Sequence, residues 1–273
     1  MILVYQSLAM LLGIGLELVF GSPNRTIGLS AVLDRLIRLI EHIFYPEFPG
    51  QQALRRRGRL MAAVASGTLF AVSAVTLFYL YRFLPAAGLA FEGILFWQTL
   101  AIRRSWTSVA RIADDLTAHD LYAARLHLSF LSNADTPRMT AAEITEHTRK
   151  AAHDDLANGM IGPLFYFFYL GAPGAVLYLV ILRLRSIHAA PDDRYRFFGI
   201  ASVRLYDVIR VIPEFLARSL RTVSGRLLPR TRRSKPYANE VAQTVSESRL
   251  SLLLAVALSL LCKVPAILTL LLR

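Results

Sequence analysis

Residues 159–182 form an apolar run of 24 residues without a charged side chain, and Gly171-Ala172-Pro173-Gly174 interrupts the run near its middle. One membrane-spanning helix needs about 20 apolar residues, so the run is long enough for one crossing or for a hairpin, but too short for two crossings. Glycine next to proline favours a turn. Irregular backbone is tolerated at membrane depth only where protein surrounds it or where it lines a cavity. The run therefore predicts a membrane protein with a pocket at this place.

The composition agrees with a membrane protein. The chain of 273 residues is 55% hydrophobic and 18% charged, whereas soluble domains have about 25% charged residues. It has 31 Lys and Arg against 19 Asp and Glu. This basic excess lies in loops beside apolar segments, and no aromatic residues alternate with it, which favours membrane orientation over nucleic-acid binding. Cys262 is the single cysteine, which excludes a disulfide within the chain and a cysteine metal site.

The hydropathy pattern predicts an all-α integral membrane protein with one domain over residues 1–273. We expect about four spans, at residues 2–20, 60–81, 86–102 and 250–272. We expect a re-entrant helical hairpin at 159–182, and amphipathic cytoplasmic helices in 103–158 and 183–249.

The distribution of basic residues favours the re-entrant hairpin. Residues 23–59 carry seven basic residues and residues 183–249 carry 14. Segments rich in Lys and Arg stay in the cytoplasm. A simple span at 159–182 would place the second of these segments outside, whereas a hairpin that leaves on its side of entry keeps both inside. The site at the hairpin would then face the cytoplasm.

Two local patterns predict helices outside the spans. Residues 25–45 have apolar side chains at helical spacing but too many charges for a span, which predicts a helix along the membrane surface. Thr140-Ala141-Ala142-Glu143 has the spacing of a capping box and predicts that a helix begins there.

Three charged residues lie inside the expected spans. Glu92 and Lys263 are functional candidates by default, because a charge in a membrane is costly, or they pair with each other as structure. Glu17 is either functional or exposed to water at the interface. The six histidines, His188 among them, show no ligand spacing with cysteine or acidic residues and are predicted to lie at the surface. His153, beside Asp154 and Asp155, is the one worth testing as a functional residue.

A series of short motifs follows in a recognisable order over roughly residues 10–240. The motifs are Gly21-Ser22-Pro23, Asp120-Leu121, Asp135-Thr136, Asn158-Gly159, Pro163-Leu164-Phe165, Gly171-Ala172-Pro173-Gly174-Ala175 with Tyr178, Arg194-Tyr195-Arg196, Phe198-Gly199, Arg204, Asp207 and Pro213. This order resembles the adenosylcobinamide-phosphate synthase (CobD/CbiB) family, which are membrane proteins of cobalamin biosynthesis.

The resemblance implies an activity and a location. Members of the family join an aminoalcohol phosphate to adenosylcobyric acid through an amide bond, with ATP and Mg²⁺. The partners are then a corrinoid precursor, an aminoalcohol phosphate and membrane lipid, without nucleic acid and with homo-oligomerisation left open. The location is the bacterial cytoplasmic (inner) membrane.

The resemblance also implies site residues. The expected catalytic residues are Asp154, Asp155 and Asp207, of which Asp154 and Asp155 would also bind the metal. The expected substrate-binding residues are Asp135, Thr136, Asn158, Ser186, Arg194, Tyr195, Arg196 and Arg204. Six of these charges, from Asp154, Asp155, Arg194, Arg196, Arg204 and Asp207, are expected to converge in space, because unpaired charges near a membrane pocket are costly.

Several motif positions depart from the family pattern. Its Asn-Thr-x-Asp-Ser-Met becomes Leu182-Arg183-Leu184-Arg185-Ser186-Ile187, which keeps only the serine, and its Asp-Gly becomes Asn158-Gly159. An arginine in place of an acid does not preserve a metal contact. AmpE, a membrane regulator, resembles the same scaffold with similarly eroded motifs. The alternative is therefore a catalytically degenerate, AmpE-like regulatory or binding protein.

Overall fold

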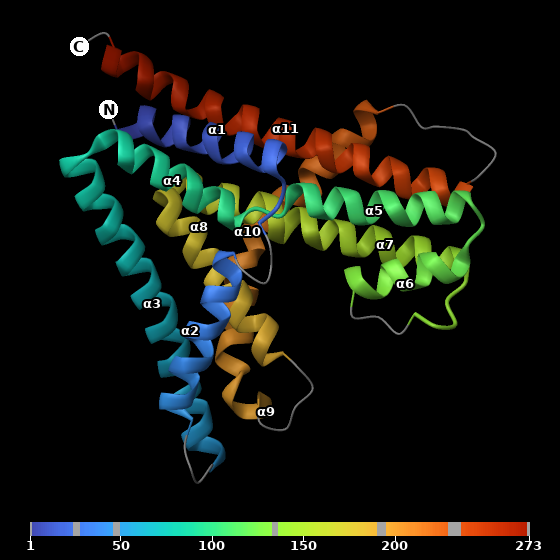
Figure 1. Ribbon diagram of the computed structural model, residues 1–273, viewed down its shortest axis with the longest axis horizontal. Coiled ribbons are helices and arrows are strands. Elements are labelled where there is room, and N and C mark those ends of the chain that lie inside the picture. Colours follow the sequence, from blue (N-terminus) through green and yellow to red (C-terminus); the bar gives the residue numbers. More distant parts are fainter. Residues whose placement is uncertain are drawn as a thin grey trace. The chain divides into compact units, whose positions relative to one another are not determined.

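The computed structural model describes residues 2–23, 28–45, 50–132, 136–189, 195–228 and 236–271, and the regular elements in these ranges are helices (Figure 1). The prediction of an all-α protein is thereby confirmed. The helices are α1 (Ile2–Phe20), α2 (Leu29–Phe44), α3 (Gln51–Phe83), α4 (Pro85–Thr99), α5 (Ile102–Thr117), α6 (Leu121–Leu131), α7 (Ala141–Leu156), the π-helix η1 (Ala157–Ile161), α8 (Gly162–His188), α9 (Tyr195–Phe198), α10 (Ile200–Leu227) and α11 (Pro236–Leu271).

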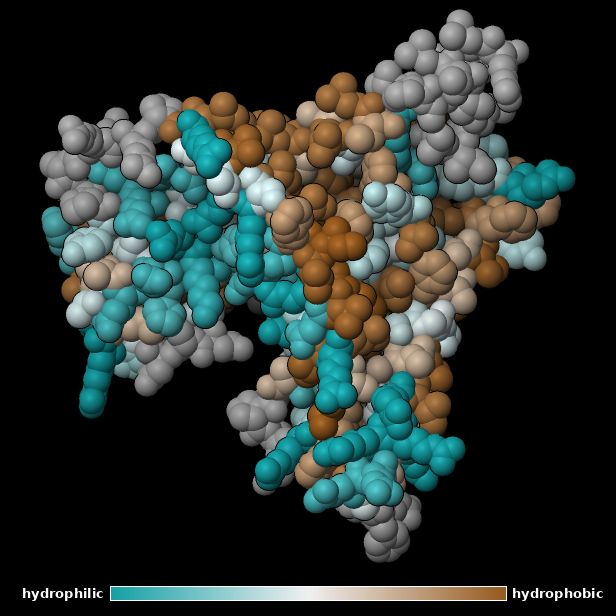
Figure 2. All heavy atoms as spheres, turned by 180° about the vertical axis from the view of Figure 1, so that it is seen from behind, coloured by the Kyte–Doolittle hydropathy of each residue, from teal (hydrophilic) through white to brown (hydrophobic). Residues whose placement is uncertain are grey.

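Four helical stretches are long and apolar enough to cross a membrane, which makes this a multi-pass membrane protein. They are Gln51–Phe83, Pro85–Thr117, Ala141–His188 and Tyr237–Lys263, and α1 adds the shorter apolar segment Val4–Phe20. Large apolar side chains on α3 are exposed, among them Val72, Val75 and Phe78, as expected for a surface that faces lipid. The surface of the first unit, defined below, is hydrophobic over its middle and hydrophilic at the end that holds α9 (Figure 2).

The chain forms two compact units. The first comprises Met1–Leu100, Gly162–Pro213 and Lys263–Arg273, and the second comprises Ala101–Ile161 and Glu214–Cys262. The core of the first unit joins α2, α3, α8 and α9 through Leu33, Ile37, Met61, Val180, Leu184 and Phe198. The core of the second joins α5, α6, α7 and α11 through Val109, Ile112, Leu128, Ile144 and Val241.

Helix α8 is a hairpin whose turn is at Gly171. This residue has φ 68° and ψ −163° inside the helix. The rings of Tyr166 and Tyr178 stack with centroids 5.2 Å apart, and a Cβ on Gly162 would lie 2.4 Å from the ring of Tyr178. In one straight helix residues 162 and 178 would be about 24 Å apart, so the chain reverses between them. The predicted hairpin is present, and its re-entry from the cytoplasmic side stays a prediction.

The first limb of this hairpin is short. Its apolar part, residues 159–170, would extend about 18 Å as a helix, whereas the hydrocarbon core of a membrane is about 30 Å thick. The limb by itself is therefore too short to cross, which agrees with a turn at membrane depth.

The turn is held by Glu92 of α4, which is 3% exposed. Its Oε1 accepts a hydrogen bond from the backbone N–H of Ala172 at 3.2 Å, and its Oε2 accepts one from the hydroxyl of Tyr81 at 2.5 Å. Lys263 is also 3% exposed; its Nζ donates to Gln6 Oε1 at 3.3 Å and lies 5.1 Å from the ring centroid of Phe168. Among the described residues no ion pair or hydrogen bond joins Glu92 and Lys263, although the charge of Glu92 acts on Lys263, so their pairing as structure stays a prediction.

Two smaller predictions can be compared with the structure. Thr140 and Glu143 form the predicted capping box at the start of α7. The hydrogen bonds that the Glu143 carboxylate accepts from the backbone N–H and hydroxyl of Thr140 lower the pKa of Glu143. Glu17, by contrast, is buried and accepts a hydrogen bond from Ser22, so its exposure to water, one of the two alternatives, is wrong.

We predict that Gly171→Ala destabilises the protein. The backbone angles of Gly171 fall in a region that is essentially restricted to glycine, where another residue costs about 1–3 kcal/mol, and the new Cβ would lie 2.7 Å from Glu92 Oε1. The expected fall in Tm, measured by thermal unfolding in detergent, is about 2–10 °C. Gly67→Ala in α3 is the control, because a Cβ there meets no atom within 4 Å. Equal Tm values for Gly171→Ala and wild type would contradict a turn at this residue.

Candidate active-site cavity

A polar cavity of about 530 Å³ lies in the first unit, between α2, the end of α8 and the start of α9. Its lining residues are Asp34, Arg38, Glu41, His42, Arg183, Ser186, Ile187 and Tyr195. Two of them, Ser186 and Tyr195, are residues that the sequence predicts to bind substrate, and the structure brings them to one cavity. Their role in binding stays a prediction.

The pattern of α2 explains why polar side chains meet here. Leu33 and Ile37 are buried in the core of the first unit. Asp34, Arg38 and Glu41 follow at spacings of four and three residues, so they share one face of the helix beside that apolar stripe. The amphipathic pattern that predicts this helix therefore also places a line of charges along one wall of the cavity.

A charge-assisted pair joins α2 to α8. Arg183 Nε donates to Asp34 Oδ1 at 2.7 Å, and Arg183 Nη2 donates to Asp34 Oδ2. The side chains are 27% and 20% exposed, so both are largely shielded from water. Two parallel hydrogen bonds of this kind fix the relative orientation of two groups as well as binding them. The pair therefore joins the two helices at the cavity that both residues line.

Glu41 is the buried acid of the cavity, with 3% exposure. Its Oε1 accepts a hydrogen bond from the hydroxyl of Tyr195 at 3.2 Å. Its Oε2 lies 3.7 Å from Nε2 of His188, whose Nδ1 lies 2.9 Å from the hydroxyl of Ser202. His188 is 3% exposed, so its predicted place at the surface is wrong. His188 lies in the interior beside Glu41 and Ser202, and a search for ligand spacing in the sequence does not reveal such neighbours.

The two arginines that replace polar residues of the family motif are both engaged within the protein. Arg183 pairs with Asp34. The guanidinium of Arg185 lies 4.3 Å from the ring centroid of Tyr206, a cation–π arrangement. Neither arginine is therefore a free cation in the cavity.

Three other predicted site residues of the first unit lie outside the cavity. Arg196, Arg204 and Asp207 are exposed and do not line it. The guanidinium of Arg196 lies 5.7 Å from the ring centroid of Phe197. Arg194 lies outside the described residues.

The remaining predicted residues belong to the second unit. Asp154 and Asp155 are half-buried near the end of α7, and Asn158 lies in the π-helix η1 that follows. This π-helix receives a hydrogen bond from outside, because the N–H of Ala101 donates to the carbonyl of Gly159 at 3.0 Å. Single π-helical turns are frequent at functional sites. The convergence of six charges, which needs both units, stays a prediction.

Thr136 is 5% exposed, and its carbonyl accepts a hydrogen bond from the N–H of Met139. Asp135 lies outside the described residues.

Four residues of the cavity and its surroundings were not predicted from the sequence as site residues: Asp34, Glu41, Arg183 and His188. A signal exists for the first two: acids at residues 34 and 41 recur after seven positions, which places them on the same face of an amphipathic helix. Such a repeat of acids beside an apolar stripe is unusual for a helix that lies on a membrane, where basic residues are typical. No local signal exists for Arg183 and His188.

Comparison with known proteins gives the family. The family model described as CobD/Cbib protein matches residues 10–260. The chain belongs to the CobD/CbiB family.

Named relatives support this assignment. The chain is 28% identical over 212 residues to "Cobalamin biosynthesis protein CbiB" of Salmonella typhimurium, and 30% identical over 217 residues to "Cobalamin biosynthesis protein CobD" of Geobacter metallireducens. Each match covers 78% of this chain and 66% of the relative. For CobD of Rhodobacter capsulatus the identity is 31% over 209 residues, with 75% and 65% covered. The chain thus spans slightly less than two thirds of these relatives. No solved structure matches.

We predict that Asp34 and Arg183 are energetically coupled. Asp34→Ala or Arg183→Ala alone leaves a shielded charge without its partner, whereas the double variant removes both charges. The double variant should therefore be less destabilised than the sum of the single variants, by about 0.5–3 kcal/mol in the free energy of unfolding. Arg35→Ala, at an exposed position of the same helix, is the control and should be additive with Arg183→Ala. Additive effects of Asp34→Ala and Arg183→Ala would show that the pair contributes nothing.

Proposed function

We propose that this CobD/CbiB family member acts in cobalamin biosynthesis and joins an aminoalcohol phosphate to adenosylcobyric acid through an amide bond. The family match over residues 10–260 and the names of the relatives support this proposal. The cavity indicates which residues would take part, because Glu41 lies there with Arg38 and His42 on the same helix.

The charges of the cavity suit the smaller substrate. An aminoalcohol phosphate has an ammonium group at one end and a phosphate at the other. The carboxylate of Glu41 is an acceptor for the ammonium group, and Arg38 and His42, both exposed at the cavity, are donors for the phosphate. Hydrogen bonds between ionised groups are the stronger ones. The two ends of the substrate would thereby be fixed at one wall.

Amide formation needs the amine without its extra proton. Glu41 would accept the extra proton of the ammonium group as general base. The nitrogen lone pair then attacks the activated carboxyl carbon, the C–N bond forms, the leaving group departs with the C–O bonding electrons, and the second proton of the nitrogen goes to the leaving group. The hydroxyl of Tyr195 donates to this carboxylate at 3.2 Å and orients it, and the ring of His188 lies 3.7 Å away.

ATP with Mg²⁺, expected from the family, would supply the activation of the carboxylate. The described residues contain no group of three or more His, Cys, Asp or Glu side chains that could hold a metal ion. They do not fit a Mg²⁺ site built from protein ligands alone. We therefore propose roles only for residues that bind and orient the substrates, and the metal role of Asp154 and Asp155 stays a prediction.

We predict that the wild-type protein restores cobalamin synthesis in a bacterial strain that lacks the synthase and receives adenosylcobyric acid.

In purified membranes, Glu41→Gln should lower kcat about 100-fold or more, because the general base is lost. Arg38→Gln should raise the KM for the aminoalcohol phosphate about 10-fold with little change in kcat. Product is measured by mass spectrometry, and Arg35→Gln is the control on the same helix.

A missing product counts against the proposal only when the protein is present in the membrane. If wild-type protein is present in the membrane at normal abundance but forms no amide, the proposed activity is wrong. The alternative of a catalytically degenerate, AmpE-like regulatory or binding protein would then take its place.

We also propose that the protein lies in the bacterial inner membrane with its site on the cytoplasmic side. The basic residues of 23–59 and 183–249, together with the hairpin at Gly171, support this topology. In a Cys262→Ala background, Ser132→Cys and Ser234→Cys should both react with a membrane-impermeant thiol reagent only after the membrane is opened. Labelling of one from outside and of the other only from inside would exclude the re-entrant hairpin.

A further inference from the structure

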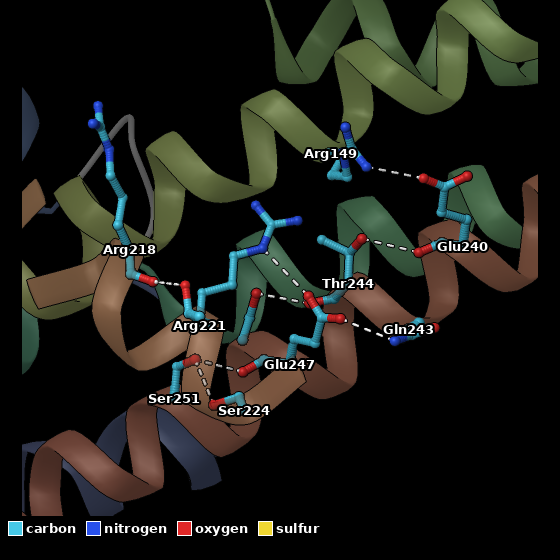
Figure 3. A network of polar contacts seen from close by, with 11 residues as sticks. Arg149, Arg218, Arg221, Ser224, Glu240, Gln243, Thr244, Glu247 and Ser251 are labelled. Carbon is cyan, nitrogen blue, oxygen red and sulfur yellow. Dashed lines mark hydrogen bonds and ion pairs between the residues drawn. The ribbon is translucent and has the colours of Figure 1, made fainter. Parts of the chain in front are cut away.

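A second polar cavity lies wholly within the second unit, where α7, the C-terminal half of α10 and the first half of α11 meet (Figure 3). We call it the arginine groove. Its volume is about 610 Å³, and its lining residues are His153, Arg218, Arg221, Thr222, Gly225, Arg226, Gln243 and Glu247. None of the proposed catalytic steps uses it.

Glu247 holds Arg221 in an extended orientation. Nε of Arg221 donates to Glu247 Oε2 at 3.3 Å, and Gln243 donates to Glu247 Oε1 at 3.0 Å. Within the described part of the chain, the two terminal nitrogens of Arg221 have no hydrogen bond, and Figure 3 shows them pointing away from Glu247. Four N–H donors of this guanidinium thus remain for a ligand.

Glu214 holds Arg218 and His153 in a similar way. Its Oε1 lies 3.1 Å from Nε2 of His153 and accepts hydrogen bonds from Arg218 Nε and Nη2 at 3.0 and 2.9 Å. Glu214 has an exposed side-chain fraction of 11%, whereas that of Arg218 is 69%. Glu214 is therefore contacted from two sides, its charge is matched by Arg218, and the arginine extends to the surface.

The lining has more positive than negative charge. Three arginines face Glu247, whose two oxygens are already engaged, and Glu214 behind the lining pairs with Arg218, which leaves one arginine charge in excess. Arg226 is exposed and has no acidic partner among the residues that the structure describes. An open groove of this composition attracts an anion with several oxygens, and a phosphate is the anion that arginine binds best.

The same turns of α10 also expose apolar side chains. Phe215, Val223 and Leu227 are 67%, 46% and 63% exposed, and they alternate along the helix with Arg218, Thr222 and Arg226. A helix that presents arginines beside exposed apolar side chains is typical of a membrane interface. Helix α11, which forms the other wall, contains the candidate span Tyr237–Lys263. The occupant should therefore have a phosphate and an apolar tail.

We propose that the arginine groove binds the headgroup of an anionic phospholipid, with Arg218, Arg221 and Arg226 at its phosphate and with Phe215 and Leu227 against its acyl chains. The excess of positive charge selects a lipid with a net negative charge over a zwitterionic one, because the ammonium group of the latter would face arginines. Basic pockets between membrane helices bind headgroups in this way.

The test is lipid retention by the purified full chain in detergent. Native mass spectrometry compares the retention of phosphatidylglycerol and phosphatidylcholine with matched acyl chains. Wild-type protein should retain phosphatidylglycerol preferentially, and Arg226→Gln should weaken this retention about 10-fold, since one charge-assisted contact is lost. Arg226 is exposed and unpaired within the described residues, so the variant should fold. Arg111→Gln, at an exposed position of α5, makes the same charge change outside the groove and should have no effect.

A second arm separates a lipid from a soluble phosphate. Glycerol phosphate at the same concentration should not displace phosphatidylglycerol, because it has no acyl chains to bind the apolar side chains. Displacement by glycerol phosphate would assign the groove to a soluble phosphate and overturn the proposal. Equal retention of the two lipids, or unchanged retention in Arg226→Gln, would also overturn it.

Discussion

The fold of the first unit depends on how the backbone N–H groups at the reversal at Gly171 find hydrogen-bond acceptors in an apolar environment. The first N–H groups of a helix have no acceptor within that helix, and in a membrane there is no water to replace one. Here the carboxylate of Glu92 accepts the N–H of Ala172, while the hydroxyl of Tyr81 binds its other oxygen. A helix N-terminus carries partial positive charge, which favours the negative charge of Glu92 at this place. The burial of one acid thus makes a turn at membrane depth stable.

The turn fixes the position of the candidate active site. The second limb of α8, residues 172–188, extends about 25 Å from the turn, and it is buried along most of this length. Its far end carries Arg183, Ser186 and His188, which reach the cavity or the groups behind it. A displacement at the turn would therefore move these side chains together, because a helix transmits it as a rigid element. The Asp34–Arg183 pair attaches α2 to the same limb.

The features that the sequence predicts are those with a local cause. Gly171-Ala172-Pro173-Gly174 marks the turn, a helical period marks α2, and the spacing of Thr140 and Glu143 marks the start of α7. The charges at Glu92 and Lys263 are recognisable as unusual within spans, although their partners are not.

What could not be predicted depends on partners far apart in the chain. Asp34 and Arg183 are 149 residues apart, and Glu41 and Tyr195 are 154 residues apart. Such pairs leave no periodic pattern, so a single sequence does not reveal that His188 is buried between Ser202 and Glu41. For the same reason, the sequence does not reveal that Ser186 and Tyr195 line the cavity whereas Arg204 does not.

The structure shows what the two arginines that depart from the family motif contact. Arg185, which stands where the family has an acid, would repel a cation if it were free, but it lies over the ring of Tyr206, and the neighbouring Arg183 is neutralised by Asp34. Neither replacement therefore adds a free cation to the cavity. Glu41 remains as the acid supported by a hydroxyl and an imidazole. Mg²⁺ is commonly held by one or two carboxylates together with the phosphates of a substrate. In the proposed reaction Glu41 would take the proton of the amine, and any cation would depend on ligands that the substrates bring.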